Sequence, residues 1–148
     1  MINNLRKLLT LHEGRVEHAY QDSLGWWTIG IGHLIDKRKG GKLPAHIIDA
    51  LFEYDLLVHE RALVQAIPWV AQLDQVRHAV MVDMTFNLGI EPFDGDGFKD
   101  WPIFVNQVKT GQYTAAAANM RKTLWARQVG RRATRLALMM ETGQWPKD

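Results

Sequence analysis

The sequence predicts an α+β fold, mostly α, with a small antiparallel sheet close to the N-terminus. Two observations carry this prediction. Apolar residues recur at helical spacing over most of the chain, with one long stretch from 44 to 66. Between residues 16 and 34, short runs of aromatic and β-branched residues alternate instead with turn-forming residues. At 148 residues and with no cysteine, the chain is expected to form one domain without disulfides or thiolate metal sites.

The first predicted element is a helix that ends at Glu13. Asn3 or Asn4 can cap its start, and Gly14 is a natural stop. A carboxylate at a helix C-terminus opposes the macrodipole, which favours cations there. Such departures from local rules are more frequent at functional sites. Glu13 is therefore a candidate functional residue, and an ordinary solvated glutamate is the alternative.

The segment from 16 to 34 predicts two or three short antiparallel strands with turns between 22 and 25. Asp22 lies in this turn, nine residues after Glu13, and Thr28 lies in a β-type run. Hydrolysis of a glycosidic bond needs one protonated carboxyl to assist the leaving group and one ionised carboxylate to activate water or attack the sugar. Glu13 is the better candidate acid, Asp22 the better ionised partner, and Thr28 could orient a water.

The rest of the chain predicts a series of helices. The helix over 44–66 begins with Pro44 in its first turn and would span roughly 35 Å, long enough to bridge two lobes. Pro68 breaks the chain, Asp74 can cap a largely apolar core helix, and Gly89 ends it. The remaining predicted helices, the last closed by Gly143, cover residues 98–109, 114–126 and 132–141.

The charge is unevenly distributed along the chain. Residues 1–98 hold 9 Lys and Arg against 13 Asp and Glu, whereas residues 99–148 hold 9 against 3. A basic C-terminal half suggests a polyanionic partner, which could be nucleic acid, an anionic membrane surface or an acidic wall polymer. The N-terminal segment has neither a signal-peptide pattern nor the length of a membrane span.

Taken together, the motifs of the N-terminal segment closely resemble the active-site segment of the phage T4 lysozyme family. They are Glu13-Gly14, then Asp22 nine residues after the glutamate, then the run GWWTIGIGHL over 25–34. The resemblance covers nearly the whole chain. Its further matches are DMTFNLG at 83–89, residues 115–119 followed by Trp125, RATR at 132–135 and TGQW at 142–145.

This resemblance implies a lysozyme-like fold over residues 1–148. A β-containing lobe would occupy about 13–43, a connecting helix about 44–66, and a helical lobe about 67–148, with the first helix packed on the helical lobe. It also implies Glu13 as general acid and Asp22 as the carboxylate that positions or activates a water held by Thr28. The family inverts anomeric configuration, which requires carboxyl groups roughly 6.5–9.5 Å apart.

The resemblance implies further site residues. The residues expected to contact substrate, matched to cleft positions of the family, are Leu34, Phe86 and Asn119. Arg132 occupies the position that in the family pairs with the acid, so we expect it to orient Glu13. His33 matches a structural histidine, and we expect an ion pair with Asp55 rather than a catalytic or metal-binding role. No metal and no cofactor are expected.

The function implied is that of an endolysin-type lysozyme. It would hydrolyse the β-1,4 bond between N-acetylmuramic acid and N-acetylglucosamine in peptidoglycan, for host cell lysis. We expect a monomer that stays in the host cytoplasm until a membrane pore releases it to the wall in the periplasm. The basic C-terminal half suits an anionic wall or outer-envelope surface, and no nucleic-acid partner is expected.

Two alternatives stay open. A lytic transglycosylase uses a lone glutamate and releases anhydro-sugar ends, and the presence of Asp22 and Thr28 argues against it. A basic helical module that binds membranes or nucleic acid is the second alternative, based on the basic, amphipathic run at 122–135. That run contains no groove-reading motif.

Overall fold

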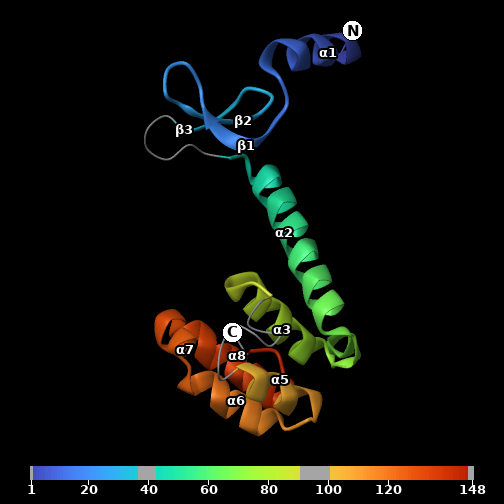
Figure 1. Ribbon diagram of the computed structural model, residues 1–148, viewed down its shortest axis with the longest axis vertical. Helices are drawn as coiled ribbons and strands as arrows, with labels where there is room; N and C mark the ends of the chain where they lie inside the picture. The colour runs from blue at the N-terminus through green and yellow to red at the C-terminus, as the bar shows by residue number, and fades with distance from the viewer. Residues whose placement is uncertain (1, 37–42, 91–100, 147–148) are drawn as a thin grey trace. The chain divides into compact units, whose positions relative to one another are not determined.

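The structure is a computed structural model that describes residues 2–36, 43–90 and 101–146 (Figure 1). It contains a three-stranded antiparallel sheet near the N-terminus, followed by helices. The predicted mostly helical α+β class is therefore confirmed. The chain divides into two compact units, Met1–Leu51 and Phe52–Asp148. The long helix predicted over 44–66 is α2 (Ala45–Ala66), which begins in the first unit and continues into the second.

The first unit opens with helix α1 (Ile2–Glu13), which ends where it was predicted to end. The amide N–H of Gly14 still donates to the carbonyl of Thr10 at 3.0 Å, but Gly14 itself has a φ of +74°. This left-handed conformation suits glycine and turns the chain out of the helix. Glu13 is consequently held at the junction between α1 and the sheet.

The sheet that follows has the strand order β1-β2-β3, with both pairs antiparallel. Its register sets Tyr20 opposite Thr28, and Thr28 opposite Leu34. Directly opposed residues share one face of a sheet, so these three side chains form a row across it. The strands are β1 (Val16–Gln21), β2 (Trp27–Gly30) and β3 (His33–Asp36).

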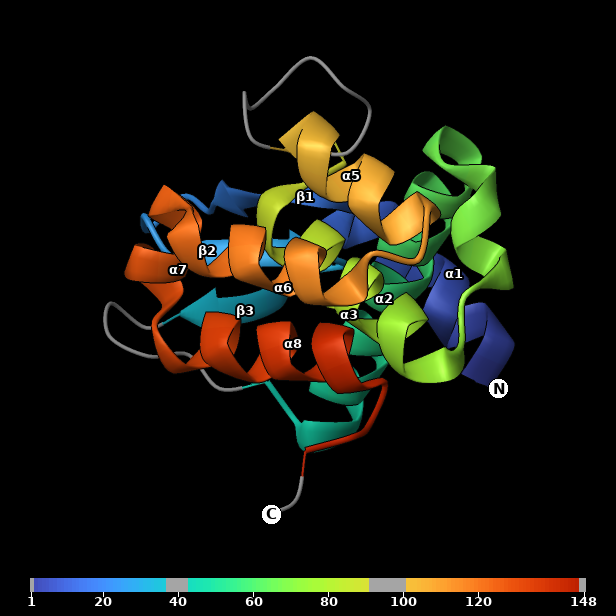
Figure 2. The same ribbon diagram turned by 90° about the horizontal axis from the view of Figure 1, so that it is seen from below.

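The second unit gathers its helices around one apolar core, to which methionine contributes heavily. The helices α6 and α8 lie side by side in both views (Figures 1 and 2). The core helix predicted after Asp74 is α3, and its buried residues include Val80, Met81 and Met84. The elements after α2 are η1 (Pro68–Gln72), α3 (Gln75–Leu88), α5 (Trp101–Lys109), α6 (Tyr113–Lys122), α7 (Leu124–Val129) and α8 (Arg131–Thr142).

Helix α3 begins and ends at the residues that its sequence predicts. The side chain of Asp74 accepts hydrogen bonds from the amide N–H groups of Val76 and Arg77 at 3.1 and 3.0 Å, which satisfies donors that the first turn leaves unpaired. At the other end, Gly89 has a φ of +79° and its N–H donates to the carbonyl of Thr85. Both predicted helix boundaries are confirmed.

The single helix predicted over 114–126 is wrong, because Thr123 divides it into α6 and α7. Thr123 is extended, with φ −74° and ψ 158°, so the helical path stops there. Its hydroxyl donates to the carbonyl of Met120 at 2.8 Å and accepts from the N–H of Ala126 at 3.1 Å. One side chain thus ends one helix and caps the next.

The basic run at 122–135 is divided as well. It crosses the break at Thr123 and a second break at Gly130, which has a φ of +55° and separates α7 from α8. The run therefore does not form one continuous basic helix of the kind that lies on a membrane surface.

Several predicted features lie outside the described residues. These are most of the charged loop at 36–41, the loop at 90–97 and the first residues of the helix predicted over 98–109. Among the helices that are described, none is long and apolar enough to cross a membrane.

Candidate active site

A cavity of about 380 Å³ in the first unit collects four of the residues predicted for the site. These four are Glu13, Asp22, Thr28 and Leu34. The sequence alone did not single out the other lining residues, which are Tyr20, Leu24, Trp26 and Gly32. The predicted acid, the predicted ionised carboxylate and the predicted water-holding hydroxyl thus face one space.

The pleat of the sheet explains why these residues meet. Side chains two apart along a strand point to the same face, and directly opposed residues on paired strands share that face. The row of Tyr20, Thr28 and Leu34 forms the floor of the cavity. The other lining residues of this segment come from the turns, Asp22, Leu24 and Trp26 from the one between β1 and β2 and Gly32 from the one between β2 and β3.

Asp22 is held rigidly by the turn between β1 and β2. Its carboxylate oxygen Oδ1 accepts the amide N–H groups of Leu24 and Trp26 at 2.8 and 2.9 Å. Its own amide N–H donates to the carbonyl of Trp26, and the N–H of Gly25 donates to its carbonyl. Two hydrogen bonds therefore fix this carboxylate, and two more fix the backbone of Asp22. Within the described residues no hydrogen bond to Oδ2 is found, which leaves that oxygen available to a water or substrate.

Thr28 lies in the centre of the sheet and is only 5% exposed. Its hydroxyl donates to the carbonyl of Trp26 over a long 3.3 Å. A hydroxyl can donate one hydrogen bond and accept others, so Thr28 keeps acceptor capacity toward the cavity. It is suited to holding a small polar molecule against the floor.

Glu13 contributes the second carboxyl group from the end of α1. Its side chain passes over Gly32, in the turn between β2 and β3, and remains exposed. A β-carbon built on Gly32 would lie within 3.3 Å of three Glu13 side-chain atoms. The side chain of Glu13 can take this position only because residue 32 has none.

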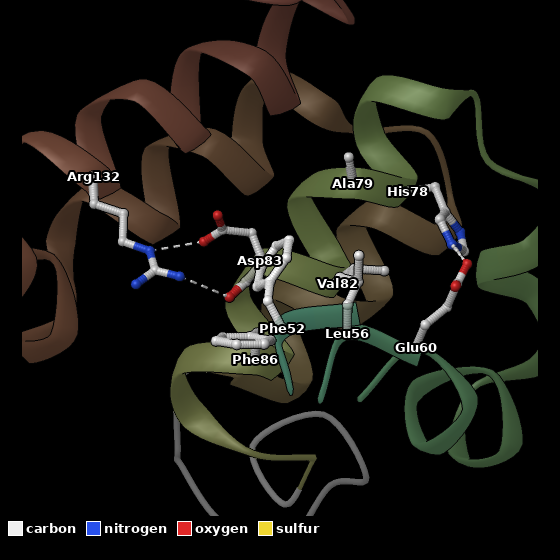
Figure 3. A pocket seen from close by; sticks show the side chains of 9 residues that line it. All are labelled: Phe52, Leu56, Glu60, His78, Ala79, Val82, Asp83, Phe86 and Arg132. Atoms are coloured by element: carbon white, nitrogen blue, oxygen red, sulfur yellow. Dashed lines mark hydrogen bonds and ion pairs between the residues drawn. The ribbon is translucent and has the colours of Figure 1, made fainter. Parts of the chain in front are cut away.

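The second unit has a cavity of its own, of about 390 Å³, which Figure 3 shows from close by. Phe86, a predicted substrate contact, lies in it and packs on the rings of Phe52 and His59 at 6.1 and 4.8 Å between centroids. Arg132 lies at one end, where its Nε donates to a carboxylate oxygen of Asp83 at 2.8 Å. This ion pair stays within the second unit.

At the other end of this cavity, His78 is fixed by two acceptors (Figure 3). Its Nε2 lies 2.9 Å from a carboxylate oxygen of Glu60, and its Nδ1 lies 3.0 Å from the carbonyl oxygen of Val70. These two contacts tie α3 to α2 and η1.

The remaining predicted residues lie elsewhere in their units. Asn119 on α6 donates to the side-chain carbonyl of Gln107 on α5 at 2.7 Å, and it does not line either cavity. His33 lies exposed on β3, opposite Ile29. Asp55 lies exposed on α2.

The predicted pairs Glu13–Arg132 and His33–Asp55 each join residues of different units, and they stay predictions. The predicted separation of the two carboxyl groups also stays a prediction. Within the described residues, no group of three or more histidine, aspartate or glutamate side chains is placed to hold a metal ion.

Comparison with known proteins points to one family. The family model described as phage lysozyme matches residues 10–139, which include the whole cavity of the first unit. Two proteins of Dictyostelium discoideum, named probable T4-type lysozyme 1 and probable T4-type lysozyme 2, are 25% and 23% identical to the chain. Each similarity covers 97% of this chain and 96% of the relative.

Proposed function

The chain belongs to the phage lysozyme family, and from this premise we propose that it hydrolyses the β-1,4 bond between N-acetylmuramic acid and N-acetylglucosamine in peptidoglycan. Membership implies a glycoside hydrolase of the lysozyme type that acts on peptidoglycan. The observation that carries the finer proposal is the single cavity onto which Glu13, Asp22 and Thr28 all open. Hydrolysis of a glycosidic bond requires two carboxyl groups around one space, and the hydroxyl of Thr28 can hold the water.

Glu13 acts as the general acid in this proposal. It gives its proton to the glycosidic oxygen as the bond to the anomeric carbon breaks. Its position over Gly32 supports the assignment, because the carboxyl projects over the cavity from the end of a helix.

Asp22 and Thr28 activate and hold the attacking water. Asp22 has one oxygen fixed by two backbone N–H groups, and its other oxygen can accept a proton from water. The hydroxyl of Thr28 holds that water on the floor of the cavity. The water attacks the anomeric carbon from the side opposite the leaving group, so the product has inverted configuration. Such a mechanism needs carboxyl groups about 6.5–9.5 Å apart.

The test is the clearing of a suspension of purified bacterial walls by the wild type beside Glu13→Gln. We expect the variant to be slower by about a hundredfold or more, because it cannot donate the proton. Glu17→Gln, which changes an exposed glutamate on β1 outside the cavity, is the matched control and should clear at the wild-type rate. Lysis that survives in Glu13→Gln would overturn the proposal.

The products separate this proposal from its nearest alternative. Hydrolysis adds water and leaves reducing N-acetylmuramic acid ends, whereas a lytic transglycosylase leaves anhydro ends 18 Da lighter. Mass spectrometry of the fragments decides between them, and NMR of fresh product reports the anomeric configuration. Anhydro ends would assign the chain to the transglycosylases instead.

We also propose that the enzyme is kept in the host cytoplasm until it is released. A hydrolase kept in the host cytoplasm would degrade the wall only after a membrane pore opens. Cells that make the protein in their cytoplasm should therefore remain intact until a pore-forming protein is also made. Lysis without the pore would show another route to the wall.

Leu34, Phe86 and Asn119 are the proposed substrate contacts, of which Leu34 lines the cavity of the first unit.

A further inference from the structure

A hydrogen bond between Gln107 and Asn119 joins two helices of the second unit and has no role in the chemistry above. The side-chain Nδ2 of Asn119, on α6, donates to the side-chain oxygen of Gln107, on α5, at 2.7 Å. Both side chains are half-buried. The two residues belong to the same unit, so the packing of α5 on α6 sets this contact (Figure 2). Because Asn119 is a proposed substrate contact, a residue that fixes its amide also affects that contact.

The backbone of Gln107 is held by the turn that ends α5. Gly111 has a φ of +73°, and its N–H donates to the carbonyl of Val108 at 3.1 Å. The N–H of Gln112 donates to the carbonyl of Gln107 at 2.8 Å. This pair of bonds around a left-handed glycine is the Schellman motif, which satisfies carbonyls that the last turn of a helix leaves unpaired. The residue that accepts from Asn119 is therefore part of a closed, hydrogen-bonded helix end.

Buried neighbours keep the two helices at this separation. Val108, which follows Gln107 in the chain, is buried in the core. Met120, which follows Asn119, is buried as well. Protein cores are close-packed, so neither helix can rotate or slide without disturbing these side chains. The contact at 2.7 Å is thus built on packed helices rather than on a surface loop.

The hydrogen bond decides which way the amide of Asn119 faces. A side-chain amide has an acceptor oxygen on one side and an NH2 donor on the other. Rotation about its last torsion exchanges the two, and the preferences of that torsion are broad, so an asparagine that nothing holds samples both orientations. Gln107 accepts through its own oxygen, which keeps the Nδ2 of Asn119 toward α5. Asn119 thereby turns its acceptor oxygen Oδ1, and not its NH2 group, away from α5.

We propose that Gln107 is a positioning residue, which holds Asn119 so that its Oδ1 accepts a hydrogen bond from the substrate. The proposal rests on the proposed function, in which Asn119 contacts the glycan. Both sugars of the glycan carry an acetamido N–H and hydroxyl groups that can donate to such an oxygen. An amide that is already oriented spares the cost of ordering it when the substrate binds. Since Gln107 acts through Asn119 and touches no reacting atom, its loss should weaken binding rather than slow the chemical step.

The experiment measures kcat and KM for the hydrolysis of soluble peptidoglycan fragments. Gln107→Met keeps the length of the side chain but removes the acceptor. We expect it to raise KM about threefold to tenfold, which is the usual contribution of one hydrogen bond, and to leave kcat within about twofold. Gln107→Glu can accept but cannot donate, so it holds Asn119 in the same orientation and should keep KM within about twofold of the wild type.

Two comparisons separate positioning from a general structural role. Gln112→Met is the matched control, because it removes another side-chain hydrogen bond at the same turn, from Gln112 to the hydroxyl of Thr110 at 3.0 Å. It should leave KM unchanged. In the Asn119→Ala protein, Gln107→Met should change KM by less than about twofold further, because the residue through which Gln107 acts is gone.

Four results would overturn the proposal. The first three are a wild-type KM in Gln107→Met, an equal rise of KM in Gln107→Met and Gln107→Glu, and a rise caused by Gln107→Met that persists in the Asn119→Ala protein. The fourth is a wild-type KM in Asn119→Ala, because Asn119 would then be no substrate contact.

A failure of the proposed function is read separately. Calorimetry of the same substitutions in the Glu13→Gln protein measures their affinity for the fragments without hydrolysis. It tests the role of Gln107 even where wall clearing by the wild type fails. The affinity should fall with Gln107→Met and be kept with Gln107→Glu, as KM predicts. A Glu13→Gln protein that binds no fragment would overturn the positioning proposal as well.

Discussion

Gly32 and Glu13 are in contact in a way that no other residue at position 32 would allow. A β-carbon on Gly32 would lie 2.8 Å from Oε2 of Glu13 and 3.1 Å from its carboxyl carbon. Real β-carbons essentially never lie under 3.0 Å from another atom, so the contact with Oε2 would force the Glu13 side chain to move. The proposed acid therefore depends on a glycine nineteen residues away for the place that its carboxyl occupies.

This contact predicts that Gly32→Ala displaces the acid, and Gly30 provides a matched control. Both glycines have left-handed backbones, with φ of +65° and +70°, so alanine strains each by about 1 kcal/mol. Only at Gly32 does the β-carbon meet Glu13, since nothing lies within 4 Å at Gly30. Gly32→Ala should lower kcat at least tenfold beyond Gly30→Ala, measured at matched folded fractions. Equal rates in the two variants would show that Glu13 does not need this contact.

A second prediction separates two roles of Asp22, as the acceptor of two backbone hydrogen bonds and as the acceptor of a proton from water. Asn keeps Oδ1 and can still accept the N–H groups of Leu24 and Trp26, but it cannot take a proton from water. Asp22→Asn should therefore keep the free energy of unfolding within about 0.5 kcal/mol while wall clearing falls by about a hundredfold or more. Asp22→Ala should lose activity and also about 1–2 kcal/mol of stability, because two amide donors lose their acceptor. Urea unfolding followed by circular dichroism gives the stabilities. An active Asp22→Asn would exclude a proton-accepting role.

The helix ends show how far local sequence determines this fold. Asp74, Gly89 and Gly143 act within a few residues of themselves, through a cap or a left-handed turn, and each boundary was predictable for that reason. Thr123 was missed because a threonine inside an apolar helical pattern is compatible with continuing the helix. Only its extended backbone identifies it as a cap.

Interactions between distant residues could not be predicted from local pattern. Arg77 donates to the carbonyls of Met140 and Glu141, more than sixty residues away, and its guanidinium lies 3.7 Å from the ring centre of Tyr113. No spacing rule connects such residues. The pair of His78 and Glu60 was likewise unforeseen.

The candidate site was predictable to a different degree. Glu13, Asp22 and Thr28 were identified from the chemistry that they can perform and from a family resemblance, and they line one cavity. Tyr20 and Trp26 were missed as lining residues, although Tyr20 lies directly opposite Thr28 on the same face of the sheet. That pairing is visible only when the strand register is known. The register depends on pairing between strands rather than on any one of them.

Asp74 should make the stability of the second unit depend on pH. Burial alone raises the pKa of its carboxyl, but the hydrogen bonds from Arg77 and Val76 and the charge of Arg77 outweigh burial and lower the pKa below 3.8. A carboxyl whose pKa is lowered by folding stabilises the fold above its ordinary pKa, and this contribution disappears as the pH falls through the lowered value. Asp74→Ala should thus cost about 1 kcal/mol at pH 7.

Urea unfolding between pH 2 and pH 7 measures this effect. The difference between wild type and Asp74→Ala should be constant above pH 3.8 and shrink below it. Asp74→Asn is the control, because it keeps the cap without the charge. Its unfolding free energy should lie close to that of the wild type at low pH. A difference between wild type and Asp74→Ala that grows as the pH falls would contradict the assignment.

The last prediction separates the ion pair of Arg132 from its charge. Two substitutions remove the ion pair, but only one of them removes the charge of Arg132. Asp83→Asn and Arg132→Ala both break the pair at 2.8 Å, in which each side chain is more than a third exposed. Such pairs contribute roughly 0–1 kcal/mol, so both variants should fold almost as well as the wild type. If Arg132 also orients Glu13, as we predict, Arg132→Ala should lower kcat about tenfold with little change in KM. Asp83→Asn, which leaves the guanidinium free to reach the acid, should stay within about twofold of the wild type. Equal kcat values in Arg132→Ala and Asp83→Asn would mean that Arg132 does nothing for catalysis beyond its ion pair with Asp83.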